Sequence, residues 1–199
     1  MSVIDRRAPA LLVCLALAAC KPATEVKTPE AAPEPSTAPA AAPPAPMVFS
    51  HDPKLDAQGV YLTDAIVQSG NLKLTALDIG QADDFADWEA GKRPTAYAPI
   101  FMAFDDVTSP TVENELGQIN RTVSIRVMPT AYRVDGREVS FHGVDPNLGQ
   151  VTFTGAFDLE ALKAAKAAGP GEPKPVLVGG LQVGDHQFRH IVFKYFAGD

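Results

Sequence analysis

The sequence predicts a mainly β (α+β) domain over residues 47–199, built as an antiparallel β-sandwich or a barrel-like sheet with two short helices. Two observations predict this fold class. Apolar residues alternate with polar ones in several segments that are bounded by turn residues, which is typical of half-buried strands. These segments follow one another through short turns, and sequential hairpins favour an antiparallel sheet folded into a sandwich or barrel.

Four strands are expected in the first half of the domain. In chain order they cover residues 60–68, 72–79, 97–104 and 123–127. Ser69-Gly70-Asn71 supplies the turn that joins the first two as a hairpin. The third is too apolar for a half-exposed strand and is expected to be central, whereas residues 107–120 are polar, lack a period and are expected to form a loop.

A short helix is predicted over residues 81–89. Phe85 and Trp88 lie three positions apart, so they share one face, and Gly91 ends the helix. Acidic residues occupy its first turns, where the helix dipole favours negative charge. The aromatic pair is expected to contact the core, although a platform for a sugar or a partner is the alternative.

The second half gives the strongest local signal of the chain. Asp135-Gly136 separates two alternating runs and predicts a type I′ hairpin, because this turn requires positive φ values. A strand over residues 151–155 then leads to a helix that begins at the N-cap Asp158 and ends at Gly169. The remaining residues predict two more strands, 176–183 with a bulge or bend at Gly179-Gly180, and 186–196. Eight or nine strands are expected in all.

Residues 1–19 are typical of a signal peptide. Arg6-Arg7 precede an apolar run, Leu11 to Ala19, that is far shorter than the roughly 20 residues of a membrane-spanning helix. The arginine pair also suggests the twin-arginine export pathway, but its flanking residues fit the pattern of that signal poorly.

Leu17-Ala18-Ala19-Cys20 resembles the lipobox of bacterial lipoproteins, which is an aliphatic residue, two small residues and a cysteine. The resemblance implies that residues 1–19 are removed and that Cys20 carries lipid, including palmitate. It also implies outer-membrane sorting in a two-membrane bacterium, because Lys21 and not Asp follows the cysteine. The alternative is an ordinary signal peptide cleaved after Ala16-Leu17-Ala18.

Residues 20–46, which begin with the expected lipidated Cys20, are predicted to be a disordered linker. Eight prolines and eight alanines stand among the 26 residues of 21–46, and Val26 is the one large apolar side chain. Proline prevents helix and sheet interior, and little is left to bury. An extended spacer of this length reaches roughly 80 Å at about 3.1 Å per residue.

Charge and cysteine content exclude several classes of function. The whole chain has a net charge of −7, and removal of residues 1–19 leaves 15 basic and 23 acidic residues, a net charge of −8. An acidic chain without a basic stripe argues against nucleic acid as a partner. The domain 47–199 contains no cysteine, which excludes a disulfide, a thiolate zinc site and a cysteine nucleophile.

The candidate sites for chemistry are weak. His186 and His190 lie four apart in a predicted strand, roughly 13 Å apart, and would need His51 or His142 to complete separate metal sites. An acidic group near the first helix lacks the spacing of a calcium loop; it comprises Asp83, Asp84, Asp87, Glu89, Asp105 and Asp106. A glycosidase pair of Asp105 with Glu113 or Glu115 rests on composition alone. Ser109 precedes a proline and is typical of a turn.

The expected function is therefore a lipid-anchored cell-envelope lipoprotein with a non-enzymatic binding or assembly domain, facing the periplasm and requiring no metal or cofactor. Its expected partners are the membrane, through the lipid on Cys20, and an envelope protein. The alternative is a carrier of a small apolar ligand, held in a cavity lined by residues such as Phe101, Phe153 and Phe193. An envelope hydrolase with its site scattered over loops is the third hypothesis.

Overall fold

The computed structural model describes residues 48–115 and 117–197, which belong to one compact unit, Pro44–Asp199. The predicted signal peptide, Cys20 and the predicted linker lie outside the described residues. The elements in chain order are β1 (Phe49–His51), β2 (Gly59–Leu62), β3 (Gln68–Ser69), β4 (Leu72–Ile79), α1 (Ala82–Glu89), β5 (Ile100–Asp106), β6 (Thr111–Glu113), β7 (Ile119–Arg121), β8 (Ser124–Val127), β9 (Pro129–Val134), β10 (Val139–Asp145), β11 (Gly149–Phe157), α2 (Leu159–Ala168), β12 (Lys174–Val183) and β13 (His186–Phe196).

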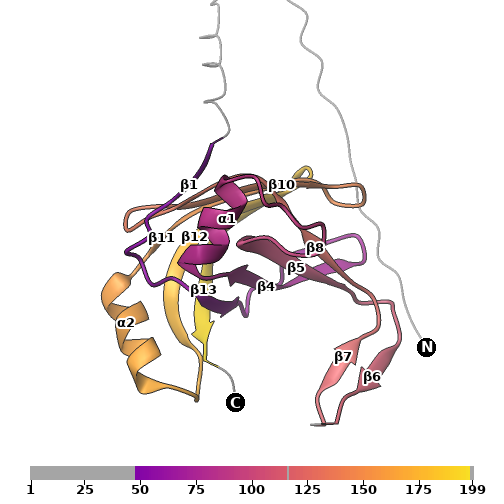
Figure 1. Cartoon of the computed structure of the whole chain (residues 1–199). Coiled ribbons are helices and arrows are strands. Elements are labelled where there is room, and N and C mark those ends of the chain that lie inside the picture. Colours follow the sequence, from indigo (N-terminus) through magenta and orange to yellow (C-terminus); the bar gives the residue numbers. More distant parts are fainter. Residues whose placement is uncertain (1–47, 116, 198–199) are drawn as a thin grey trace, which may run out of the picture. The chain divides into compact units, whose positions relative to one another are not determined.

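Eleven strands form one large curled sheet, a half-barrel, in the order β1-β9-β10-β11-β12-β13-β2-β4-β5-β8, with β3 paired to β4 (Figure 1). The other two described strands, β6 and β7, form a separate two-stranded sheet. β1 runs parallel to β9, and the other pairs among the described strands are antiparallel. The predicted mainly β fold with two short helices is therefore confirmed, with more strands than the sequence indicated.

Aromatic and aliphatic side chains fill the inside of the curl. The largest fully buried ones are Tyr61, Tyr132, Phe104, Phe141, Phe153, Phe193, Leu74, Leu77, Ile100, Met102, Leu177 and Leu181. The second helix, α2, packs against β12 and β13 and contributes Leu162 and Ala165 to this core. The first helix, α1, lies beside β1 and buries Phe85 and Trp88. The prediction that these two side chains contact the core is therefore confirmed.

Both helices begin at the expected positions for identifiable reasons. Asp158 caps α2, because its carboxylate accepts a hydrogen bond from the Ala161 amide at 2.9 Å. Gln81 and Asp84 form a capping box at the start of α1, in which the Asp84 carboxylate accepts from the Gln81 amide at 2.8 Å.

The turn at Asp135-Gly136 differs from the predicted type I′ turn. Val134 pairs with Val139, so four residues form the loop, and Gly136 does not adopt positive φ. Asp135 explains the difference, because its carboxylate accepts hydrogen bonds from the amides of Arg137 and Glu138 at 2.7 and 2.9 Å. This side chain stabilises the longer loop without a left-handed residue.

The predicted irregularity at Gly179-Gly180 is confirmed as a register shift between β12 and β13. Gly179 pairs with Ile191 and Leu181 pairs with Phe188, so β13 carries one extra residue in this interval. His190 lies in that interval with φ 56°, in the left-handed region. The bulge breaks the simple alternation expected for residues 186–196, so His186 and His190 do not share one continuous face.

Candidate functional site

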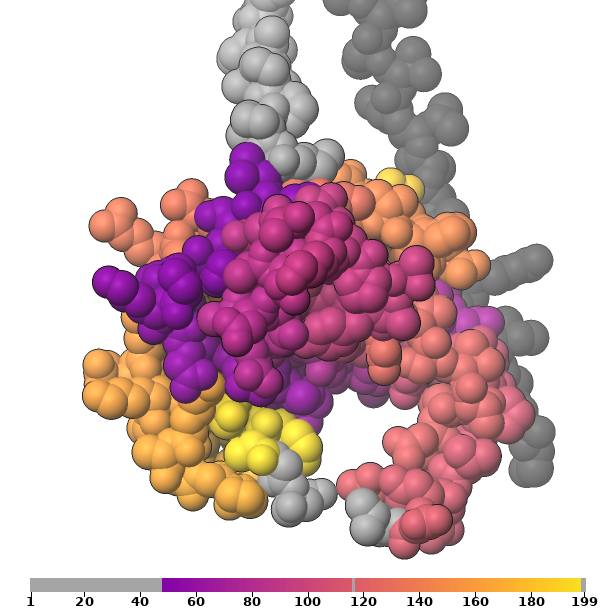
Figure 2. All heavy atoms as spheres, in the orientation of Figure 1, coloured from indigo at the N-terminus to yellow at the C-terminus, as the bar shows by residue number. Residues whose placement is uncertain are grey.

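Residues 107–120 contain a hairpin, contrary to the expected loop. Strands β6 and β7 pair only with each other, and we call the described residues 111–115 and 117–121 the arm. Figure 1 shows it projecting from the half-barrel, and in Figure 2 an open gap lies between the arm and the C-terminal part of the chain, drawn in yellow. The segments Thr111–Glu113 and Ile119–Arg121 are short, and this explains why no period was visible.

Hydrogen bonds hold both ends of the arm. At its base, Ser109 donates from Oγ to the Asp106 carbonyl at 2.7 Å, and Arg121 donates from Nη1 to the Ser109 carbonyl at 2.7 Å. At its tip, Asn114 and Gln118 bond through their side chains at 2.9 Å. Ser109 is buried at the base of the arm and holds the turn there through these hydrogen bonds, which agrees with the turn position expected from the sequence.

The arm carries two apolar side chains that are more than half exposed to solvent. Ile119 is 73% exposed and Val112 is 52% exposed. An isolated two-stranded hairpin is marginally stable in water, and apolar side chains on it raise the free energy of the uncovered state. An exposed apolar arm held at both ends is typical of a contact surface.

A hollow of about 310 Å³ lies between the arm and the outer face of β4 and β5. Its lining comprises Lys73, Thr75, Asp105, Val107, Thr111, Ile119 and Arg121. Lys73 and Asp105 are cross-strand neighbours on the sheet. The lining therefore combines one exposed apolar side chain with charges of both signs, unlike the mostly apolar lining that suits a small apolar ligand.

A second group of side chains joins α1 to β1 and β9. The Glu89 carboxylate accepts hydrogen bonds from His51 Nδ1 at 2.9 Å and from the Tyr132 hydroxyl at 3.1 Å. Burial and the neighbouring Glu89 charge raise the pKa of the Tyr132 phenol. The His51 side chain is 10% exposed and stacks on Phe85 with ring centroids 5.0 Å apart.

This carboxylate–imidazole pair resembles the orienting half of an acid–base site, but the other imidazole nitrogen is sealed from solvent. His51 Nε2 is buried and has no hydrogen-bond partner among the described residues. A general base must reach the proton that it removes, directly or through one water. The pair therefore fixes α1 against β1 and does not present a reactive group.

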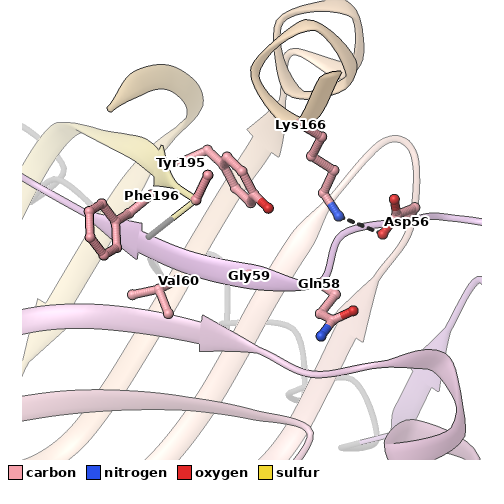
Figure 3. Close-up of a pocket in the computed structure, with 8 residues that line it drawn as sticks. Asp56, Gln58, Gly59, Val60, Lys166, Tyr195 and Phe196 are labelled. Atoms are coloured by element: carbon pink, nitrogen blue, oxygen red, sulfur yellow. Dashed lines mark hydrogen bonds and ion pairs between the residues drawn. The ribbon is translucent and has the colours of Figure 1, made fainter. Parts of the chain in front are cut away.

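A third feature is a groove of about 570 Å³ beside the C-terminal end of β13 (Figure 3). Lys166 reaches from α2 to Asp56, with Nζ and Oδ1 2.5 Å apart, and its ammonium lies 5.6 Å from the centre of the Tyr195 ring. Gly59 lets the same ring approach, because a Cβ there would collide with Tyr195 Cε2. Tyr195 is therefore held between the Lys166 ammonium and the backbone at Gly59.

The structure separates the remaining predicted site residues. In the acidic group, Asp84 caps α1, Asp87 pairs with Lys92 at 2.8 Å and Glu89 points toward His51. Among the described residues no three His, Cys, Asp or Glu side chains gather as metal ligands, so His51, His142, His186 and His190 form no such group.

The glycosidase and carrier hypotheses rest on residues that the structure also places apart. Asp105 lines the hollow, whereas Glu113 and Glu115 are on the arm and do not line it. Phe153 and Phe193 pack edge to face at 5.4 Å in the filled core. Phe101 lies on the outer face beside Tyr97 and under the Arg126 guanidinium.

Comparisons with known proteins gave no matching family model, no similar curated protein and no similar solved structure. In the part of the chain that the structure describes, neither helix is long and apolar enough to cross a membrane.

Proposed function

We propose that this chain is a lipid-anchored protein of the bacterial cell envelope whose β-rich domain is a non-enzymatic binding or assembly module. The anchor is a lipid on Cys20, and the expected location is the outer membrane with the domain facing the periplasm. The resemblance of Leu17-Ala18-Ala19-Cys20 to the lipobox supports the anchor. The linker over residues 20–46 then gives the domain its reach from the membrane.

The arm is the observation that carries the binding function. It exposes Ile119 and Val112, it is supported at base and tip by hydrogen bonds, and it borders a hollow of mixed charge. An element that is held at its base and tip and keeps apolar side chains in water favours burial against another polypeptide. The carrier and hydrolase hypotheses have no comparable observation in their favour.

A photo-crosslinking amino acid at position 119 of the full chain, introduced in growing cells, tests the binding function. We expect a discrete adduct of higher mass that depends on irradiation. The matched control is the same amino acid at Val144, which is 64% exposed on β10 and lies outside the arm. No adduct from position 119, or equal yields from both positions, contradicts a binding role of the arm.

The anchor has a separate test. Cys20→Ser should abolish incorporation of labelled palmitate and release the protein from the membrane fraction, because no other cysteine remains after residue 19. Label that persists in the variant overturns the lipid attachment at this residue.

A further inference from the structure

We propose that the partner of the arm is a second copy of this chain, with each copy placing its arm in the hollow of the other. This inference rests on the proposed binding role of the arm and names its partner. It follows from two features of the arm and hollow, namely the face on which the apolar side chain lies and the unpaired charges. A two-fold contact between two copies would satisfy both features.

The pairing register decides which arm residues face the hollow. Thr111 pairs with Arg121 and Glu113 pairs with Ile119, so these four side chains share one face of the ribbon. Three of the four line the hollow, which places Glu113 on the same side, nearer the tip. Ile119, the most exposed apolar side chain of the arm, therefore faces the hollow. It remains exposed there because it does not fill the hollow.

The charges of the arm and the hollow are complementary and unpaired. Among the described residues, Glu113 and Glu115 have no ion-pair partner, and Lys73 on the floor of the hollow has none within 4 Å. Asp105 is the cross-strand neighbour of Lys73 and offsets part of its charge. An arm that enters the hollow brings an unpaired carboxylate to an unpaired ammonium, which sets the register of the contact.

A two-fold axis satisfies both surfaces at once. In an isologous dimer, a residue i that contacts j in the partner requires that j also contacts i. Two arms that exchange places bury Ile119 against the partner's arm and hollow, and bring Glu113 to the partner's Lys73 twice. Attachment of both copies to one membrane confines them to a layer and raises their effective concentration.

The experiment uses the full lipidated chain in membranes, with Ile119→Cys as a cross-linking variant. The domain itself has no cysteine, and Cys20 is blocked by its lipid under the proposed function. Mild oxidation should give a disulfide-linked dimer on a non-reducing gel. The control, Val144→Cys, is similarly exposed and should give at least fivefold less dimer.

Charge reversal then tests the register. Added to Ile119→Cys, Glu113→Lys should lower the dimer yield at least fivefold, and Lys73→Glu should do the same. The two reversals together should restore the yield, because each ion pair re-forms with opposite signs. A melting curve for each variant confirms folding, and Glu113 lies on an exposed ribbon where substitution leaves the core intact.

Three results overturn the dimer: no disulfide from Ile119→Cys, equal yields from the control, or no rescue by the double reversal. The photo-crosslinking adduct separates this failure from failure of the proposed function. An adduct with the mass of two copies supports self-association. An adduct of another mass overturns self-association and keeps a binding role for the arm, whereas no adduct overturns both.

Discussion

Gly155 of β11 lies directly opposite Gly179 of β12, and the ring of Phe153 covers both. A Cβ built on Gly155 would lie 2.6 Å from Phe153 Cζ, and one built on Gly179 would lie 2.6 Å from Phe153 Cε2. The absence of two side chains lets a core aromatic ring lie against the backbone of β11 and β12. The adjoining bulge in β13 increases the local bend.

The first prediction concerns this contact. Gly179→Ala should lower the free energy of unfolding by about 1–3 kcal/mol, because the added methyl group must displace Phe153 or the backbone of β11. Gly180→Ala is the matched control, since the nearest atom to its Cβ is the Phe188 carbonyl oxygen at 3.7 Å. Urea unfolding of both variants measures the difference. Equal losses at the two positions would contradict the steric role of Gly179.

The sequence predicted much of the fold because local signals and tertiary structure agree in most segments. Alternating residues of β11, such as Val151 and Phe153, face the core as expected, and Asp158 caps α2 as predicted. The Gly179-Gly180 pair indicated an irregularity, but its location on the opposite strand, at His190, depends on pairing that no local pattern encodes.

The candidate site was harder to predict, because the arm consists of two three-residue strands. Val112 and Ile119 were too few apolar residues to establish a period. Gly117, which adopts φ 77° in the connecting turn, was the one local signal of a hairpin. The pairing of His51 and Tyr132 with Glu89 joins residues about 40 positions apart, which a single sequence does not reveal.

The second prediction concerns the Glu89 carboxylate. Glu89→Ala should lower the free energy of unfolding by about 1–3 kcal/mol, because the buried Tyr132 hydroxyl and His51 Nδ1 lose their shared acceptor. Glu89→Gln keeps a side-chain oxygen and should cost less than about 1 kcal/mol. Thermal or urea unfolding measures both variants. If the glutamine variant is as unstable as the alanine variant, the charge and not the acceptor stabilises this contact.

The third prediction is the pH dependence that Asp135 contributes. Its pKa is lowered, first by the hydrogen bond from Arg133 Nε at 2.7 Å and then by the turn amides. A carboxyl with a lower pKa in the folded state stabilises it above the unfolded pKa, and this stability is lost as pH falls through the folded pKa. Asp135→Asn should therefore be less stable than the parent above pH ~5, with the difference shrinking below pH ~4.

Urea unfolding at several pH values gives this comparison directly. The exposed location of the Arg133–Asp135 pair adds a salt dependence, because added salt screens charges at the surface. A difference between Asp135→Asn and the parent that stays constant down to pH 2 would show that the carboxylate charge is not what holds the turn.

The fourth prediction has the opposite sign and concerns Asp78. This half-buried carboxyl lies on β4, and burial raises its pKa, with the Arg126 charge partly offsetting the effect. A raised carboxyl pKa gives stability that is present below the unfolded pKa and is lost as pH rises through the folded pKa. Asp78→Asn should therefore be more stable than the parent at pH 7, and this advantage should disappear as the pH falls toward 3.

Arg126 provides the control for this prediction. Its guanidinium also lies 5.3 Å from the centre of the Phe101 ring, so Arg126→Gln should lower stability in either background. The loss at pH 7 should be larger when Asp78 is present than in the Asp78→Asn background, because only then does the substitution remove an attraction between opposite charges. Equal losses in the two backgrounds would mean that Arg126 does not stabilise the buried carboxylate, and that the Asp78→Asn gain reflects burial alone.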